Sequence, residues 1–100
     1  MTTKLVYTDE AISDLQRLRD FIKQNNPSAA QRIASTLINR MRTLQDFPQL
    51  GKPVESSPVP GSIRDMVFDQ YIVRYSIHPS TVIILRIWHE LENARSVDAN

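Results

Sequence analysis

Three arginines and a histidine in the last third of the chain are the residues whose types could carry out chemistry. They are Arg64, Arg74, Arg86 and His89. Guanidinium groups stabilise negative charge that develops on a phosphate, and histidine can transfer a proton near neutral pH. The two residues that we single out as candidate catalytic groups are Arg64 and His89.

Trp88 places a large aromatic side chain next to this positive charge. Arg86 and Trp88 lie two positions apart, so they share one face of a strand, and Arg74 joins them if the preceding strand pairs alongside. Arginine and tryptophan on one face are typical of the energetically dominant part of an interface. We therefore expect Arg74, Arg86 and Trp88 to form a target-binding patch.

Each of these residues also has a purely structural interpretation. His89 falls on a core-facing strand position, where a histidine is more often hydrogen-bonded than catalytic. Arg64 could anchor a loop by donating to carbonyl groups. Arg74 opposite Asp65 could form a cross-strand ion pair that contributes little at a surface. Trp88 could cap the sheet.

The composition is that of one small domain. The 100 residues carry a net charge of +1, with 23% charged and 41% apolar residues, which excludes global disorder. The sequence has no run of about 18 apolar residues, which a membrane-spanning helix would need. The lack of cysteine excludes a disulfide framework and fits the cytoplasm. We expect one domain over residues 1–92 and a frayed tail over 93–100, and no cofactor or metal.

Two amphipathic helices are predicted in the first half of the chain. Apolar residues at helical spacing predict a helix over residues 9–24, with Thr8 as its N-cap. A turn at residues 25–27 precedes a second stripe, which predicts one helix from Pro27 to about Phe47. Four prolines between residues 48 and 62 then predict a long loop.

The last third is predicted to form strands over residues 63–68, 71–77 and 82–89, and residues 5–7 form a short strand that pairs with one of them. A two-residue turn at Asp69 places Asp65 opposite Arg74. The expected core residues are Tyr71, Val73, Tyr75 and Ile77 with Ile83, Leu85 and Ile87, which requires an odd number of residues in the turn around Pro79. We predict an α+β fold of order β-α-α-β-β-β, with a helical hairpin packed on a small antiparallel sheet.

Several sequence motifs occur in a fixed order along residues 4–90. They are Asn26-Pro27 followed by Ala29-Ala30, then Phe47-Pro48-Gln49-Leu50-Gly51-Lys52, Ile63-Arg64-Asp65-Met66-Val67-Phe68, Tyr71-Ile72-Val73-Arg74-Tyr75 and Ile84-Leu85-Arg86-Ile87-Trp88-His89. Their order and spacing resemble the RelE/ParE toxin superfamily of type II toxin–antitoxin modules.

The resemblance implies a toxin that is neutralised by a cognate antitoxin protein. One branch of the superfamily, similar to RelE, cleaves messenger RNA on the ribosome, and the other, similar to ParE, poisons DNA gyrase. We expect the antitoxin to lie along the helical hairpin, on the apolar residues Leu15, Leu18, Ile22, Leu37 and Met41. Addition of an antitoxin strand to the edge of the sheet is a further expected contact.

Two departures from the RNA-cleaving pattern favour the ParE-like branch. Val54 follows Gly51-Lys52-Pro53 where some RNA-cleaving relatives have a glutamate, and Glu90 follows His89 where they have an aromatic or basic residue. A net charge of +1 is also low for a protein that must bind both the ribosome and messenger RNA. We favour gyrase poisoning without catalysis. The alternatives are a ribosome-dependent mRNA endoribonuclease and a non-toxic protein-binding module of the same fold.

Overall fold

The computed structural model describes residues 3–92, so the expected frayed tail lies outside the described residues. Helix α1 (Asp9–Asn25) begins at the predicted cap. Thr8 Oγ1 accepts a hydrogen bond from the Ala11 backbone N–H at 3.0 Å. Asp9 and Glu10 occupy the first turn, where the helix dipole favours negative charge.

The second helical region is interrupted, where the sequence predicted one helix from Pro27 to about Phe47. A 3₁₀ turn, η1 (Pro27–Ala29), leads into α2 (Ala30–Arg42), and a second 3₁₀ turn, η2 (Thr43–Gln45), follows it. At this end of α2 the Thr43 hydroxyl donates to the Arg40 carbonyl, and the chain tightens into a 3₁₀ turn, a common way for a helix to end. Leu44 in this turn is buried in the core.

Five strands form one mixed sheet in the order β1-β5-β4-β3-β2. They are β1 (Lys4–Tyr7), β2 (Lys52–Pro53), β3 (Ile63–Phe68), β4 (Tyr71–His78) and β5 (Thr81–His89). The expectation of a purely antiparallel sheet is wrong at one edge, because β1 runs parallel to β5. Neighbouring parallel strands need a long connection, which the two helices and strands β2 to β4 provide between β1 and β5.

The strand register follows the prediction between β3 and β4 and departs from it between β4 and β5. Asp65 lies opposite Arg74, as predicted. The turn between β4 and β5 has two residues, Pro79 and Ser80, instead of an odd number. A bulge at Leu85 shifts the pairing by one residue and so restores the predicted register beyond it: Tyr75 pairs with Ile84, whereas Arg74 pairs with Arg86.

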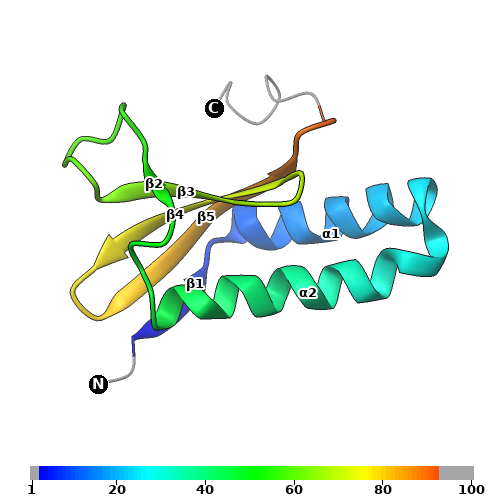
Figure 1. Ribbon diagram of the computed structural model, residues 1–100, viewed down its shortest axis with the longest axis horizontal. Coiled ribbons are helices and arrows are strands. Elements are labelled where there is room, and N and C mark those ends of the chain that lie inside the picture. The colour runs from blue at the N-terminus through cyan, green and yellow to red at the C-terminus, as the bar shows by residue number, and fades with distance from the viewer. Residues whose placement is uncertain (1–2, 93–100) are drawn as a thin grey trace.

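The bulge changes which residues of β5 enter the core. Ile87 is buried as predicted, but before the bulge the buried residues are Val82 and Ile84 instead of Ile83 and Leu85. The hairpin of α1 and α2 covers one face of the sheet (Figure 1), and the core lies between these two layers. No helix within residues 3–92 has the length and apolar character needed to cross a membrane.

Candidate functional site

Beyond Ile84, the outer edge of β5 lies against side chains instead of another strand. Strand β1 ends beside Ile84, and α1 turns away from the sheet at Thr8. Side chains bond the backbone groups along this edge. Thr8 donates to the Leu85 carbonyl and Arg17 donates to the Ile87 carbonyl. Asp14 accepts from the Ile87 N–H, and Glu92 accepts from the His89 N–H. These four side chains take the place of a neighbouring strand.

Asp14 is the centre of this arrangement. Its side chain is on the buried stripe of α1, with the residue only 1% exposed, and it accepts hydrogen bonds from Arg17, Arg86 and the Ile87 N–H. Burial alone would raise the pKa of Asp14, but these hydrogen bonds lower it below its ordinary value of 3.8. The carboxylate therefore remains ionised inside the protein.

Arg86 belongs to this buried network. Its Nε atom lies 2.9 Å from Asp14 Oδ2, and its Nη2 atom lies 3.2 Å from Oδ1. The sequence predicted that Arg86 would face away from the helices, in a target-binding patch. The guanidinium instead bonds Asp14 on α1, because β1 ends at Ile84 and leaves the edge of β5 at Arg86 uncovered by a strand.

Arg74 and Trp88 do lie together, on the sheet face opposite the helices. The Arg74 guanidinium stands 5.3 Å from the centre of the Trp88 ring. It also forms two hydrogen bonds with Asp65, at 2.9 and 3.0 Å, as the cross-strand pairing predicted. Trp88 is only 7% exposed. A partner would therefore contact mainly Arg74 and the rim of the indole.

Arg64 anchors the long loop. Its guanidinium donates to the carbonyls of Gly61 at 3.1 Å and Gly51 at 2.9 Å. Tyr75 supports the same segment from below, because its buried hydroxyl accepts from Gly51 N–H at 2.8 Å and donates to the Pro48 carbonyl at 2.6 Å. Gly51 has no room for a side chain, since an added Cβ would lie 2.8 Å from the Tyr75 oxygen.

His89 occupies a buried position at the other end of the sheet. Its ring centre lies 4.8 Å from that of Tyr71 and 5.2 Å from that of Phe21. His89 Nδ1 accepts a hydrogen bond from Leu91 N–H at 3.0 Å. Tyr71 pairs with His89 and Tyr75 pairs with Arg64, so the structure does not bring Arg64 and His89 together. Four residues along a strand separate them by about 13 Å.

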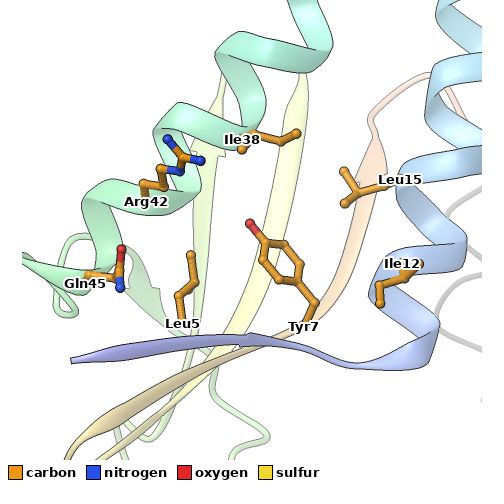
Figure 2. Close-up of a pocket in the computed structure, with 7 residues that line it drawn as sticks. All are labelled: Leu5, Tyr7, Ile12, Leu15, Ile38, Arg42 and Gln45. Atoms are coloured by element: carbon orange, nitrogen blue, oxygen red, sulfur yellow. The ribbon is translucent and has the colours of Figure 1, made fainter. Parts of the chain in front are cut away.

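An open groove runs between the two helices above β1 (Figure 2), with a volume of about 460 Å³. Leu5 and Tyr7 rise from β1 into it, and the helices contribute apolar side chains from both sides. Ile12 is 46% exposed and Ile38 is 37% exposed. Burial raises the pKa of the Tyr7 hydroxyl, and nearby Arg42 partly opposes this effect. Most of the residues that line the groove are apolar, and Arg42 is the cation among them.

The residues expected to bind the antitoxin occupy different places in the structure. Leu15 lines the groove. The other four are buried in the protein's own core, namely Leu18, Ile22, Leu37 and Met41. The helical periodicity identified the inward stripe of each helix, but residues of that stripe contact the sheet. Ile12 and Ile38, which only broaden the stripes, are the side chains left at the surface.

A sequence model of the "ParE toxin of type II toxin-antitoxin system, parDE" matches residues 5–94 of the chain. The chain belongs to this toxin family. Toxin RelE2 of Caulobacter vibrioides is 33% identical over 87 residues, which cover 86% of this chain and 93% of that protein. Toxin RelE1 of the same organism is 32% identical over 94 residues, covering 92% of this chain and 98% of that protein.

Solved structures share the fold of this ParE-family toxin. A chain of the chromosomal ParDE system from P. aeruginosa superposes with a TM-score of 0.74 at 21% identity, covering 87% of this chain and 95% of that one. A chain of the RelBE2 toxin–antitoxin complex from Mycobacterium tuberculosis gives a TM-score of 0.67 at 24% identity, covering 89% and 99%. The expected α+β fold, two helices on one sheet, is confirmed.

Sequence reasoning missed the structural roles of Asp14 and Tyr75 in this ParE-family toxin. Asp14 follows Ala11 by three positions and precedes Leu18 by four, so the helical period already placed it on the buried face. A carboxylate at such a position needs buried hydrogen-bond donors. The signal for Asp14 was therefore present, whereas only the folded chain shows that Tyr75 meets residues 48–51.

We expect Tyr75→Phe to destabilise the toxin and to loosen its long loop. The change leaves the buried Gly51 N–H and the Pro48 carbonyl without their partner, which costs about 1–3 kcal/mol. Urea unfolding followed by circular dichroism measures the loss. Hydrogen exchange at the Gly51 amide should accelerate by more than the global loss of stability explains.

Tyr7→Phe is the matched control. The Tyr7 hydroxyl lines the open groove and makes no hydrogen bond to any described residue, so its removal should change the free energy of unfolding by less than about 0.5 kcal/mol. Equal losses for the two variants would show that the Tyr75 hydroxyl does not hold the loop.

Proposed function

We propose that this toxin inhibits growth by binding and poisoning DNA gyrase, without cleaving RNA. The observation that carries the proposal is that the arginines proposed for phosphate binding already have partners within the protein. Arg64 donates to loop carbonyls, Arg74 to Asp65 and Arg86 to Asp14. A guanidinium bound to a carboxylate, as in Arg74 and Arg86, has lost much of its attraction for phosphate.

The geometry of His89 supports the same proposal. Cleavage of RNA by a 2′-hydroxyl needs proton-transfer groups and positive charge around one phosphate. His89 packs between two aromatic rings, and its Nδ1 atom already accepts a backbone N–H. It lies about 13 Å along the sheet from Arg64. Arg74 and the rim of Trp88 remain as a surface better suited to a protein target.

Ribosome-dependent cleavage of messenger RNA is the second candidate function. The relatives from Caulobacter vibrioides that match this chain at 32–33% identity carry the name RelE. In this alternative, the target would have to displace Asp65 from Arg74 to expose a phosphate-binding guanidinium.

The order of events after induction separates the two mechanisms. If gyrase is the target, DNA synthesis should stop and DNA-damage signalling should rise while bulk translation continues at first. Pulse labelling with a radioactive nucleoside and a radioactive amino acid measures both rates. Early collapse of translation, with new mRNA ends inside codons and intact DNA, would contradict the gyrase proposal.

Residue substitutions test the same point at the site. Arg74→Ala should reduce growth inhibition at least tenfold, because it removes the partly buried cation of the proposed patch. His89→Gln should reduce toxicity only modestly, since no proton transfer is involved. A folded His89→Gln variant without toxicity, alongside a fully toxic Arg74→Ala variant, would assign His89 a catalytic role.

We further propose that a cognate antitoxin neutralises this toxin by laying an apolar helical segment in the groove between α1 and α2. The groove exposes Ile12 and Ile38 to solvent and places Arg42 at one end. Exposed apolar grooves of this kind accept one face of an amphipathic helix. An acidic residue at the end of that helix would pair with Arg42.

A further inference from the structure

The two helices of the hairpin differ in the charge that they expose. Helix α1 exposes three carboxylates, two of them in its first turn. Helix α2 has none, and residues 21–45 contain no aspartate or glutamate, although the chain has 11 acidic residues. Arg32, Arg40 and Arg42 are all exposed on α2. The net charge of +1 is therefore unevenly distributed, with a local excess of positive charge on α2.

The helical period gathers these three arginines on the side of α2 that faces away from the core. Arg32 and Asn39 are seven positions apart, so they lie in one row along the helix. Arg40 flanks this row on the side of β3, where its guanidinium stands 4.8 Å from the centre of the Phe68 ring. Arg42 flanks it on the side of the groove. The ten residues from Arg32 to Arg42 span about 15 Å along the helix.

The side chains on this side of α2 are available to a ligand. None of the three arginines forms an ion pair with a described residue, in contrast to Arg74 and Arg86. The side chains of Ser35 and Asn39 are exposed beside them and make no hydrogen bond within residues 3–92. We call this surface the α2 face, which consists of Arg32, Ser35, Asn39, Arg40 and Arg42.

The chemistry of the α2 face matches a chain of phosphates. Arginine, serine and asparagine side chains are among the groups that contact the DNA backbone, and such contacts do not depend on base sequence. Duplex DNA carries about one negative charge per 1.7 Å of its axis, so cations spread along a helix can each meet a phosphate. A second copy of the chain would instead bring like charges together.

We propose that the α2 face binds the sugar–phosphate backbone of duplex DNA. The three guanidinium groups pair with phosphates, and Ser35 and Asn39 donate hydrogen bonds to phosphate oxygens. The choice of DNA over other polyanions rests on the proposed function, because gyrase acts on duplex DNA. The α2 face includes neither Arg74 nor Trp88, so the toxin can contact gyrase and the DNA that gyrase holds through different surfaces.

Fluorescence anisotropy tests the proposal with the purified full chain and a short labelled DNA duplex of arbitrary sequence. We expect a dissociation constant of about 1–100 µM at physiological salt. Three phosphate contacts predict that log affinity falls against log salt concentration with a slope of about −3. Gyrase is absent from this assay, so its outcome is separate from that of the pulse-labelling experiment, which tests the gyrase proposal.

Two double variants with the same change in charge locate the binding surface. Arg32→Gln with Arg40→Gln should weaken DNA binding about tenfold or more and reduce the salt slope to about −1. Arg42 is left in place because it also lines the groove. Arg19→Gln with Lys23→Gln, at exposed positions of α1, should weaken binding less than about twofold.

Three results would overturn the proposal. The first is no binding of DNA by the wild-type toxin at about 1 mM, well above the expected range. The second is an equal loss of affinity in the two double variants, which would mean that DNA responds only to the net charge. The third is tighter binding of an RNA duplex of the same length, which would assign the α2 face to RNA.

Discussion

Replacing Asp14 with alanine is expected to lower the free energy of unfolding by about 3–5 kcal/mol, because it breaks a buried charge network by removing its centre. Arg86 would keep a partly buried charge without its carboxylate, and the Ile87 N–H would lose its acceptor. Urea unfolding measures the change. Asp20→Ala on an exposed position of the same helix should change stability by less than about 0.5 kcal/mol.

The pH dependence of stability provides a second measurement of the same network. The folded pKa of Asp14 lies below its ordinary value of 3.8, so its contribution is complete above that value and is lost as the pH falls through the folded pKa. Wild-type stability should therefore fall below about pH 4. Asp14→Asn should start from lower stability and show a shallower acid decline. An unchanged acid slope would show that Asp14 is not ionised in the native protein.

Placing a charge in the groove is expected to abolish neutralisation. The double variant Ile12→Glu and Ile38→Glu should weaken binding of the cognate antitoxin about a hundredfold or more, because two carboxylates would be desolvated against an apolar helix. Both side chains are already exposed, so the toxin itself should remain folded. Isothermal titration calorimetry measures the affinity, and co-expression measures the return of growth inhibition.

Val59→Glu is the matched control for the groove variant, because Val59 is exposed on the long loop outside the groove. It should leave antitoxin binding unchanged. If Val59→Glu and the groove variant weaken binding equally, the antitoxin does not use the groove. If Val67→Glu alone abolishes neutralisation, the main antitoxin contact lies at the β3 edge and the groove proposal is wrong.

Local features of this toxin could be predicted from the sequence because they depend on residues close together in the chain. Thr8 caps α1 through Ala11, three residues away. The two-residue turn at Asp69, whose φ of 53° an aspartate tolerates, fixes the pairing of Asp65 with Arg74. Alternation along β4 placed Val73 and Tyr75 in the core. The loop-anchoring interpretation of Arg64 agrees with its hydrogen bonds.

Features that depend on distant segments were decided by the tertiary structure. The parallel pairing of β1 with β5 joins residues more than 70 positions apart, and no local pattern specifies its direction. The bulge at Leu85 allows a two-residue turn and a buried Ile87 to coexist. The edge of β5 beyond Ile84, which no strand covers, lets Arg86 bond Asp14 on α1. Burial is likewise a property of the assembled layers, which is why Leu18 and Met41 are core residues and Ile12 and Ile38 remain available to a partner.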